Sequence, residues 1–193
     1  MKATILNGAL PGDGFVDGVA QILADRLANR GGQVQTWTLR DEKVAYCLGC
    51  FECWTKSPGI CRIDDAGRAI AASIIAGDLV VYLTPVTFGG YSSLLKKAVD
   101  RSICLVSPFF TQIDGEVHHQ PRYRRYPDLL GIGVLPGPHP AQERIFGDLV
   151  ARNALNLYAR MQRAVTLYRS QAPAEIAAAL LRVLPAPMER IAA

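Results

Sequence analysis

The most concentrated chemistry in this 193-residue chain is a group of thiols, because four of its five cysteines lie close together. They follow the spacing C-x2-C-x2-C-x7-C, at Cys47, Cys50, Cys53 and Cys61. Four converging thiolates are the ligand set of an iron–sulfur cluster. Zinc is an alternative, although zinc sites usually use two well-separated pairs of ligands. The same residues would also suit reduced, metal-free thiols in a tight loop shaped by Gly49, Pro58 and Gly59.

Composition limits the class of protein. Hydrophobic residues make up 50% of the chain, which is enough for the core of one domain spanning residues 1–193. No apolar run reaches the ~20 residues of a membrane helix, so we expect no membrane partner. The N-terminus does not resemble a signal peptide, which favours a reducing, cytoplasmic compartment over structural disulfides. The net charge of +4 is scattered, so we expect no nucleic-acid partner.

Hydrophobic patterning predicts strands that alternate with helices. Strands are expected at residues 3–6, 34–39, 78–84, 129–135 and 163–168, with helices after each of them. On the helix after residue 93, the charged residues up to Arg101 are expected to point outward. Residues 107–128, which include His118 and His119, are expected to form an irregular, solvated loop. This alternation predicts a doubly wound α/β sheet.

In such a sheet the ligand lies at the carboxyl ends of the strands. Three loops should therefore meet there, at residues 7–14, 85–91 and 136–139. The first loop is rich in glycine and opens a helix, so its N–H groups could hold a phosphate, although it lacks G-x-G-x-x-G. The second loop offers backbone amides and the aromatic side chain of Phe88, which could border a flat ring of a ligand. For the first and the second loop, the alternative is a plain turn without a ligand. The cysteine loop also follows a strand, so we expect it at the same edge.

Two stretches resemble a known family. Residues 84–90, running into Leu95-Lys96 and Asp100-Arg101, resemble the isoalloxazine loop and following helix of flavodoxin-like NAD(P)H-dependent FMN reductases. The cysteine cluster with Asp64-Asp65 after it resembles the cluster-binding motif of their iron–sulfur flavoprotein branch. The similarity covers roughly residues 1–135. It implies a flavodoxin-like three-layer sandwich, with a five-stranded parallel sheet of order 2-1-3-4-5, and assembly into homodimers or homotetramers.

The resemblance also implies cofactors and the residues that hold them. FMN phosphate would meet the first loop, at Asn7, Gly8, Gly14, Phe15 and Val16. The flavin ring would meet Pro85, Val86, Thr87, Phe88, Gly89, Pro136 and Gly137. One [4Fe-4S] cluster would be held by Cys47, Cys50, Cys53 and Cys61, and no side chain is assigned a catalytic role. The family's first loop usually supplies Ser, Thr or Asn side chains, whereas this chain has no hydroxyl between Gly8 and Val16 and adds Asp13.

The implied activity is that of an FMN-dependent oxidoreductase. It would take electrons from NAD(P)H and pass them to a small acceptor or a protein partner, through the cluster if one is present. One alternative is an electron carrier without an NAD(P)H site, which would not oxidise NADPH when given a quinone. Another is a flavodoxin-like domain that has lost FMN and acts through its thiols.

Overall fold

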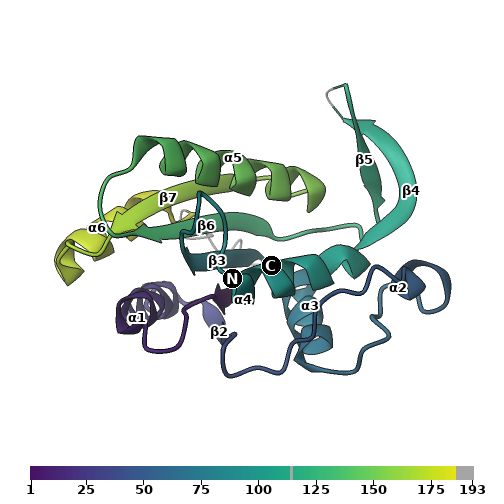
Figure 1. The fold of residues 1–193 in the computed structure, drawn as a ribbon, viewed down its shortest axis with the longest axis horizontal. Helices are drawn as coiled ribbons and strands as arrows, with labels where there is room; N and C mark the ends of the chain where they lie inside the picture. Colours follow the sequence, from purple (N-terminus) through teal and green to yellow (C-terminus); the bar gives the residue numbers. More distant parts are fainter. Residues whose placement is uncertain (114, 186–193) are drawn as a thin grey trace, which may run out of the picture.

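Five parallel strands form the central sheet of the computed structural model (Figure 1). The structure describes residues 1–113 and 115–185; residue 114 and the last eight residues of the expected domain, 186–193, lie outside the described residues. The sheet order is β2-β1-β3-β6-β7, which confirms the predicted order 2-1-3-4-5 when its strands are counted along the chain. The strands are β1 (Lys2–Asn7), β2 (Gln33–Thr38), β3 (Leu79–Pro85), β6 (Asp128–Leu135) and β7 (Gln162–Tyr168).

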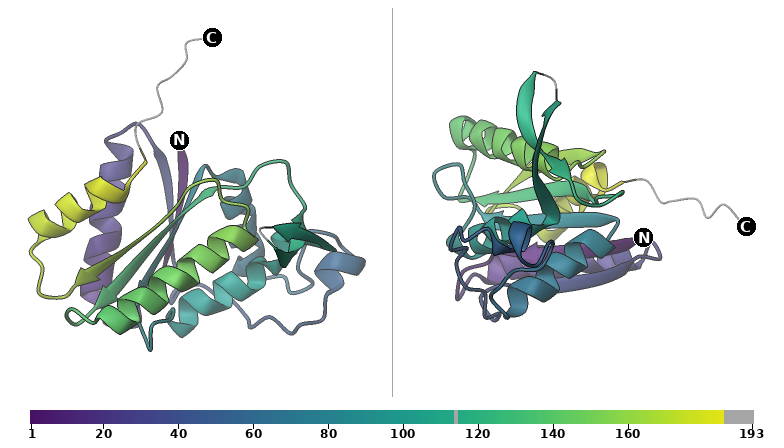
Figure 2. Two further views of the ribbon diagram at one scale, coloured as in Figure 1. Left: turned by 90° about the horizontal axis from the view of Figure 1, so that it is seen from above. Right: turned by 90° about the vertical axis from the view of Figure 1, so that its right-hand side faces the viewer.

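Helices cover both faces of this sheet (Figure 2). One core contains the apolar faces of α1 (Gly14–Ala28) and α6 (Pro173–Val183). The other contains those of α3 (Ala66–Ala76), α4 (Ser93–Arg101) and α5 (Pro140–Asn156). Every residue of β3 is buried, as its continuous apolar run predicts for a central strand. The result is the three-layer α/β architecture expected from the sequence.

Glycines on β6 set how closely α5 can approach the sheet. A Cβ built on Gly131 would lie 2.4 Å from Cγ2 of Val150 on α5, and one on Gly133 would lie 3.0 Å from the ring of Phe146. Only glycine leaves room for this packing. The close approach fixes the N-terminus of α5 beside the carboxyl ends of β3 and β6.

The expectation of an irregular loop at residues 107–128 is wrong for most of that stretch. β4 (Val106–Ile113) and β5 (Glu116–Pro121) pair as an antiparallel hairpin that projects beyond the sheet (Figure 1). The pairing shifts register between Val106 and Phe110, where Pro108 has no N–H to donate. His118 is only 8% exposed, with its ring nitrogens 3.1 Å from Asn156 Oδ1 and 3.2 Å from Glu116 Oε2. Residues 107–121 therefore form regular structure for the most part, and His118 packs against the rest of the protein.

Two short helices complete the described chain. α2 (Glu52–Thr55) lies within the cysteine loop, and the 3-10 helix η1 (Ser102–Leu105) extends α4. Within residues 1–113 and 115–185, no helix has both the length and the apolar character needed to cross a membrane.

Candidate functional site

The three predicted loops meet at the carboxyl edge of the sheet, where hydrogen bonds tie them together. The N–H of Gly8 donates to the carbonyl of Leu83 at 2.8 Å. Ser92 Oγ donates to the carbonyl of Gly8 at 2.7 Å. The N–H of Val86 donates to the carbonyl of Val134 at 2.9 Å, which joins the second loop to β6. The edge is therefore a fixed platform.

In the first loop, Asn7 shapes the turn. Its Nδ2 donates to Asp17 Oδ1 at 2.8 Å, and its Oδ1 accepts from the N–H of Ala9 at 3.0 Å. The residue is 2% exposed. The amide nitrogen and the amide oxygen of Asn7, which was predicted to contact the phosphate, thus both form hydrogen bonds within the protein.

Asp13 closes the same loop over the start of α1. Its carboxylate caps the helix by accepting from the N–H of Val16 at 3.3 Å. Both its oxygens also accept from Arg169, at 2.9 and 2.7 Å. These hydrogen bonds from Arg169 are the main reason why the pKa of Asp13 lies below its ordinary value of 3.8. Asp13 therefore stays ionised at neutral pH.

The other predicted residues of this loop divide between surface and core. Gly14 is exposed, whereas the side chain of Val16 is fully buried against the sheet. Phe15 is half-buried, with its ring centroid 5.7 Å from the guanidinium carbon of Arg169. Gly14 and Val16 can therefore offer only backbone groups to a ligand at the helix start.

The second loop turns sharply and holds an aromatic ring in solvent. Thr87 and Gly90 exchange backbone hydrogen bonds at 3.1 and 2.8 Å across the turn. Phe88 and Gly89 at its tip have φ of 51° and 78°. A left-handed conformation is costly for a bulky residue, and such strain is typical of functional sites. The Phe88 side chain is 92% exposed.

The first residue of this loop and the whole third loop frame that turn. Pro85 is buried at the end of β3, while Pro136 is exposed and Gly137 half-exposed after β6. His139 caps α5, its Nδ1 accepting from the N–H of Gln142 at 3.4 Å. The predicted flavin-ring residues therefore surround one edge, with Phe88 as the side chain most available to a ligand.

The four clustered cysteines line a single cavity of about 300 Å³. Gly49 and Phe51 adopt left-handed φ of 62° and 56°, which turns the chain between the first three thiols. Cys53 is 7% exposed, and burial, followed by the neighbouring thiols, raises its pKa. Apolar groups form much of the remaining wall, from Leu48, Phe51, Ile63 and Ile103.

This cavity does not lie where we expected it. Arg101 and Ile103, at the end of α4 and just after it, line the cavity, whereas the ring loop precedes the start of α4. A nine-residue helix is about 13 Å long, so the two sites are at opposite ends of α4. The loop leaves β2 at the carboxyl edge and then runs away from it, toward α2 and the hairpin (Figure 1).

Zinc is the alternative to a cluster for these thiols. Four sulfurs around one zinc ion would lie about 4 Å apart, given Zn–S bonds of about 2.3 Å. Among the described residues, no group of three or more His, Cys, Asp or Glu side chains is close enough to hold a single metal ion.

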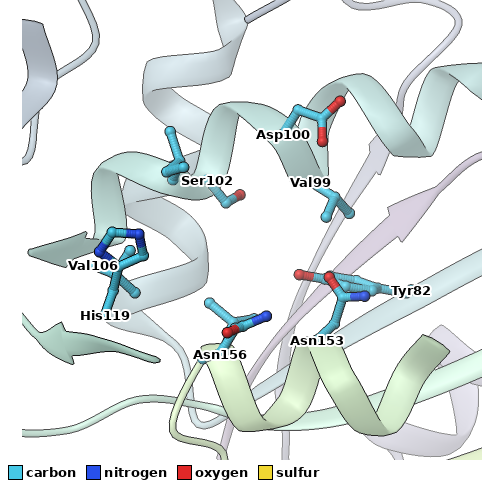
Figure 3. A pocket seen from close by; sticks show the side chains of 10 residues that line it. Tyr82, Val99, Asp100, Ser102, Val106, His119, Asn153 and Asn156 are labelled. Carbon is cyan, nitrogen blue, oxygen red and sulfur yellow. The ribbon is translucent and has the colours of Figure 1, made fainter. Parts of the chain in front are cut away.

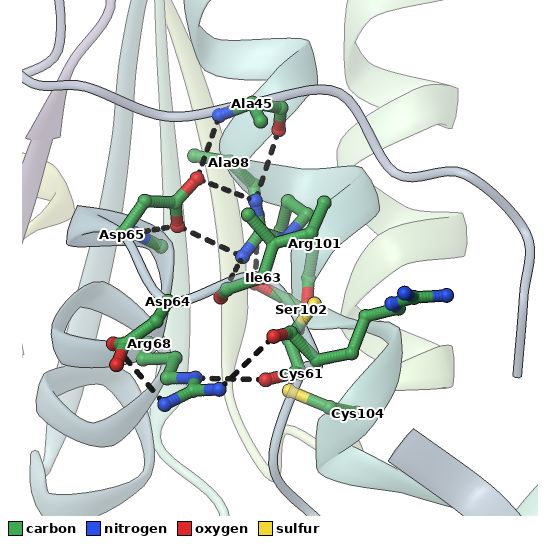
Figure 4. A network of polar contacts seen from close by, with 12 residues as sticks. Ala45, Cys61, Ile63, Asp64, Asp65, Arg68, Ala98, Arg101, Ser102 and Cys104 are labelled. Atoms are coloured by element: carbon green, nitrogen blue, oxygen red, sulfur yellow. Dashed lines mark hydrogen bonds and ion pairs between the residues drawn. The ribbon is translucent and has the colours of Figure 1, made fainter. Parts of the chain in front are cut away.

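A buried arginine holds the cysteine loop by both ends (Figure 4). Arg101 was expected to point outward, but its side chain is 1% exposed. Its Nη1 donates to the carbonyl of Ala45 at 3.1 Å, and its Nη2 donates to that of Ile63 at 3.1 Å. Both nitrogens also donate to Asp65, at 2.9 and 2.8 Å. Because residues 45 and 63 flank the four cysteines, this pair clamps the loop.

Asp65 gives this clamp a pH dependence. Burial alone would raise its pKa, but hydrogen bonds from Arg101 and from the N–H groups of Ala45 and Gly67 outweigh burial and hold it below 3.8. A lowered carboxyl pKa stabilises the fold above the unfolded-state pKa, and that stability is lost as the pH falls below it. We expect the free energy of unfolding to fall steeply below pH 4 and to fall less steeply in Asp65→Asn, as measured by urea titrations at several pH values. Equal slopes would contradict this.

A second cavity, of about 260 Å³, adjoins the first and shares Asp100 and Ile103 with it (Figure 3). Its polar lining comes from separate elements, with Tyr82, Ser102, His119, Asn153 and Asn156 pointing inward. Burial raises the pKa of Tyr82, so its hydroxyl stays protonated. The sequence carries no signal for this cavity, because the residues that line it come from parts of the chain that are far apart and belong to no common motif.

Comparison of the sequence with known protein families identifies the family of this chain. The sequence model described as NADPH-dependent FMN reductase matches residues 1–119, which is more than half of the chain. This chain belongs to the NADPH-dependent FMN reductase family. The match includes the first loop, the cysteine loop and the ring loop.

Two curated proteins with similar sequences are named iron–sulfur flavoproteins. The one from Methanocaldococcus jannaschii is 29% identical over 102 residues, covering 53% of this chain and 52% of the relative. The one from Archaeoglobus fulgidus is 26% identical over 102 residues, covering 53% and 49%. The chain thus spans about half the length of the curated relatives it matches.

Solved structures share the FMN reductase fold along nearly the whole chain. An NAD(P)H:quinone oxidoreductase from Methanothermobacter marburgensis has a TM-score of 0.67 and 13% identity, covering 94% of this chain and 92% of its own. An FMN-dependent NADH-azoreductase from Bacillus anthracis, solved with FMN, has a TM-score of 0.65 and 14% identity, covering 94% of both chains. At this identity the likeness is one of fold.

The FMN of this family fits one end of the site better than the other. At the ring end, the loop's N–H groups at residues 86, 87, 89 and 90 have acceptors within the described chain, which leaves the N–H of Phe88 for a ligand. At the phosphate end, Asp13 already takes the N–H of Val16 and both arms of Arg169. As folded, the carboxylate of Asp13 therefore competes with a phosphate for the start of α1.

Replacing Phe88 should affect stability and flavin binding in opposite directions. Phe88→Gly relieves the left-handed conformation, so we expect a free energy of unfolding unchanged or higher by about 1 kcal/mol. Loss of ring stacking should weaken flavin binding roughly fivefold to tenfold. Thermal melts and fluorescence titration with riboflavin measure the two effects.

The control for Phe88 is Phe109→Ala, which removes another exposed phenylalanine, 67% exposed, from the hairpin. It should leave flavin affinity unchanged. If the Phe88 variant binds flavin as tightly as the unmodified protein, the ring does not contact the ligand.

Proposed function

We propose that this protein is an NAD(P)H-dependent flavin oxidoreductase that passes electrons to a small acceptor or a protein partner. The observation that carries the proposal is the ring loop at the carboxyl edge, where Phe88 stands in solvent and its N–H has no acceptor within the described chain. Membership of the FMN reductase family supports it. A bound flavin would supply hydride acceptance from the nicotinamide and release of electrons singly or in pairs.

The chain's own contribution is binding and positioning. Phe88 would cover one face of the ring, and its N–H would donate to the polar edge of the flavin. Thr84 and Ser92, on either side of the loop, are joined by a hydrogen bond: Thr84 Oγ1 accepts from the N–H of Ser92 at 2.8 Å. No titratable side chain needs to exchange a proton with the substrate in this arrangement, so we assign none as catalytic.

We further propose that Cys47, Cys50, Cys53 and Cys61 hold one [4Fe-4S] cluster. All four line one cavity, and all are free thiols, which suits a reducing cytoplasm. The names of the two curated relatives support the same cofactor. Such a cluster would supply single-electron relay to a partner.

Self-association into dimers or tetramers is part of the proposal. It is supported by exposed apolar side chains on the projecting hairpin, at Phe109, Phe110 and Val117, which are 67%, 63% and 70% exposed. Such patches are typical of interaction surfaces. Light scattering that gives the mass of a single chain would contradict it.

One experiment tests the cofactors together. The protein is purified without oxygen, and its absorption spectrum, iron, sulfide, flavin and NADPH oxidation with a quinone are measured on one sample. Flavin binding with NADPH oxidation supports the oxidoreductase, and near-stoichiometric iron and sulfide support the cluster. Flavin binding without NADPH oxidation would instead indicate an electron carrier.

A second candidate function is a flavodoxin-like domain that has lost FMN and acts through its thiols. The observation that favours it is the carboxylate of Asp13 at the phosphate end of the site. A colourless protein that binds neither FMN nor riboflavin would establish this candidate over the first.

A further inference from the structure

The start of α1 already contains an anion. A phosphate in this fold would accept hydrogen bonds from N–H groups in the first turn of the helix. The carboxylate of Asp13 accepts from one of them, that of Val16, at 3.3 Å. Its side chain is 9% exposed, so it lies in the loop and not in solvent.

The cation that a phosphate would need is also engaged. Arg169 follows β7 at the same edge and meets Asp13 in a two-pronged ion pair, at 2.9 and 2.7 Å. The N–H of Arg169 donates to the carbonyl of Leu135 at 3.0 Å, which fixes its backbone beside the third loop. Both arms of the guanidinium are therefore satisfied before any ligand arrives.

A second ion pair completes the balance of charge around the loop. Arg40 Nη1 lies 2.8 Å from Asp17 Oδ1, one turn along α1 from Asp13. Hydrogen bonds from Arg40, and next from Asn7, outweigh burial and lower the pKa of Asp17. Two arginines thus face two ionised carboxylates, and their formal charges cancel. A phosphate carrying nearly two negative charges would gain little attraction here and would be repelled by Asp13.

We propose that the Asp13–Arg169 pair sets ligand specificity at this site, removing the usual preference for a phosphorylated flavin. FMN and riboflavin then bind with similar affinity, because the isoalloxazine ring that meets the ring loop is common to both and the phosphate gains little attraction at the start of α1. This inference rests on the proposed function, since it requires the edge to bind a flavin.

The test compares FMN with riboflavin in the unmodified protein and in Asp13→Asn. Asparagine is a good helix N-cap, so the variant should keep the loop while losing the charge. We expect the two dissociation constants of the unmodified protein to agree within about threefold. In Asp13→Asn, FMN should bind at least about tenfold tighter and riboflavin within about threefold of its former affinity, by flavin fluorescence titration at fixed salt.

Two further variants make the test specific. Asp25→Asn removes a carboxylate from the same helix, one that accepts from Gln21 at 2.8 Å, and should change neither affinity. Arg169→Gln, added to Asp13→Asn, should abolish the gain for FMN, because the freed guanidinium is what the phosphate would bind.

Three outcomes would overturn the inference. FMN bound a hundredfold tighter than riboflavin by the unmodified protein would contradict it, as would an unchanged FMN affinity in Asp13→Asn. Both leave the proposed oxidoreductase intact. If neither flavin binds to either protein, the proposed function fails and the inference fails with it.

Discussion

Replacing Arg101 with methionine is expected to lower the free energy of unfolding by about 3–5 kcal/mol. The side chains of Arg101 and Asp65 are 1% and 4% exposed, so the variant leaves an ionised carboxylate buried without its partner. It also frees the carbonyls of Ala45 and Ile63, which Arg101 binds at 3.1 Å each. Urea unfolding followed by circular dichroism gives the change in free energy.

The same variant should loosen the cysteine loop before the rest of the fold. Both ends of the loop lose their common donor, so we expect proteases to cut within residues 45–63 sooner than in the unmodified protein. The matched control is Lys96→Met on the same helix, which breaks an exposed ion pair with Asp100 and should cost less than about 0.5 kcal/mol. Equal losses in the two variants would show that Arg101 does not clamp the loop.

The parallel sheet could be predicted because local patterns determine it. The apolar run at residues 78–84 has no polar alternation, and only a strand covered on both faces tolerates that. It became β3, Leu79–Pro85, with every residue buried. The order of the strands came from the resemblance to a family, since periodicity does not specify which strands pair.

The hairpin was missed because its composition suggested solvent. Two histidines, three arginines and two prolines lie within residues 107–125, and this composition favoured a solvated loop. One signal was present: Asp114-Gly115 stands between Phe-Phe-Thr-Gln-Ile and Glu-Val-His-His, and Asp-Gly between β-prone runs is a hairpin signature. The charged residues on either side outweighed it.

Arg101 was misplaced because a charge was assumed to point outward. Leu95, Ala98 and Arg101 are spaced by three residues, so they share the buried face of α4, and all three are buried. A charge on an apolar face needs a buried partner, and Asp65 supplies it from a residue 36 positions earlier. Periodicity could have identified the anomaly but not the partner.

The phosphate end of the site shows where sequence reasoning ends. The sequence shows Asp13 as a carboxylate in the loop that the resemblance assigns to the phosphate. In the structure it caps α1 and pairs with Arg169, 156 residues later. Nothing local to Arg169 predicts this contact, which exists because parallel strands bring β1 and β7 to end at the same edge.

The cysteine cavity leads to the second large effect. Cys53→Ser is expected to reduce iron in anaerobically purified protein from about four atoms per chain to nearly none, because Cys53 is the most buried thiol of the four and serine is a poor ligand for iron. Broad absorption above the flavin bands should disappear, while riboflavin affinity should stay the same, because the ring loop is at the other end of α4. Iron and sulfide assays with the absorption spectrum measure the loss.

Cys104 provides the control within the same chain. At 2% exposed it is more buried than Cys53, but it does not line the cavity, and its Sγ lies 3.4 Å from the carbonyl of Arg101. Burial is the main reason why its pKa rises to about 11, so it remains a neutral core thiol. Cys104→Ala should therefore lose some stability and keep its iron. If Cys104→Ala loses iron as completely as Cys53→Ser, the loss reports a disturbed core, and the four clustered thiols are not the ligands.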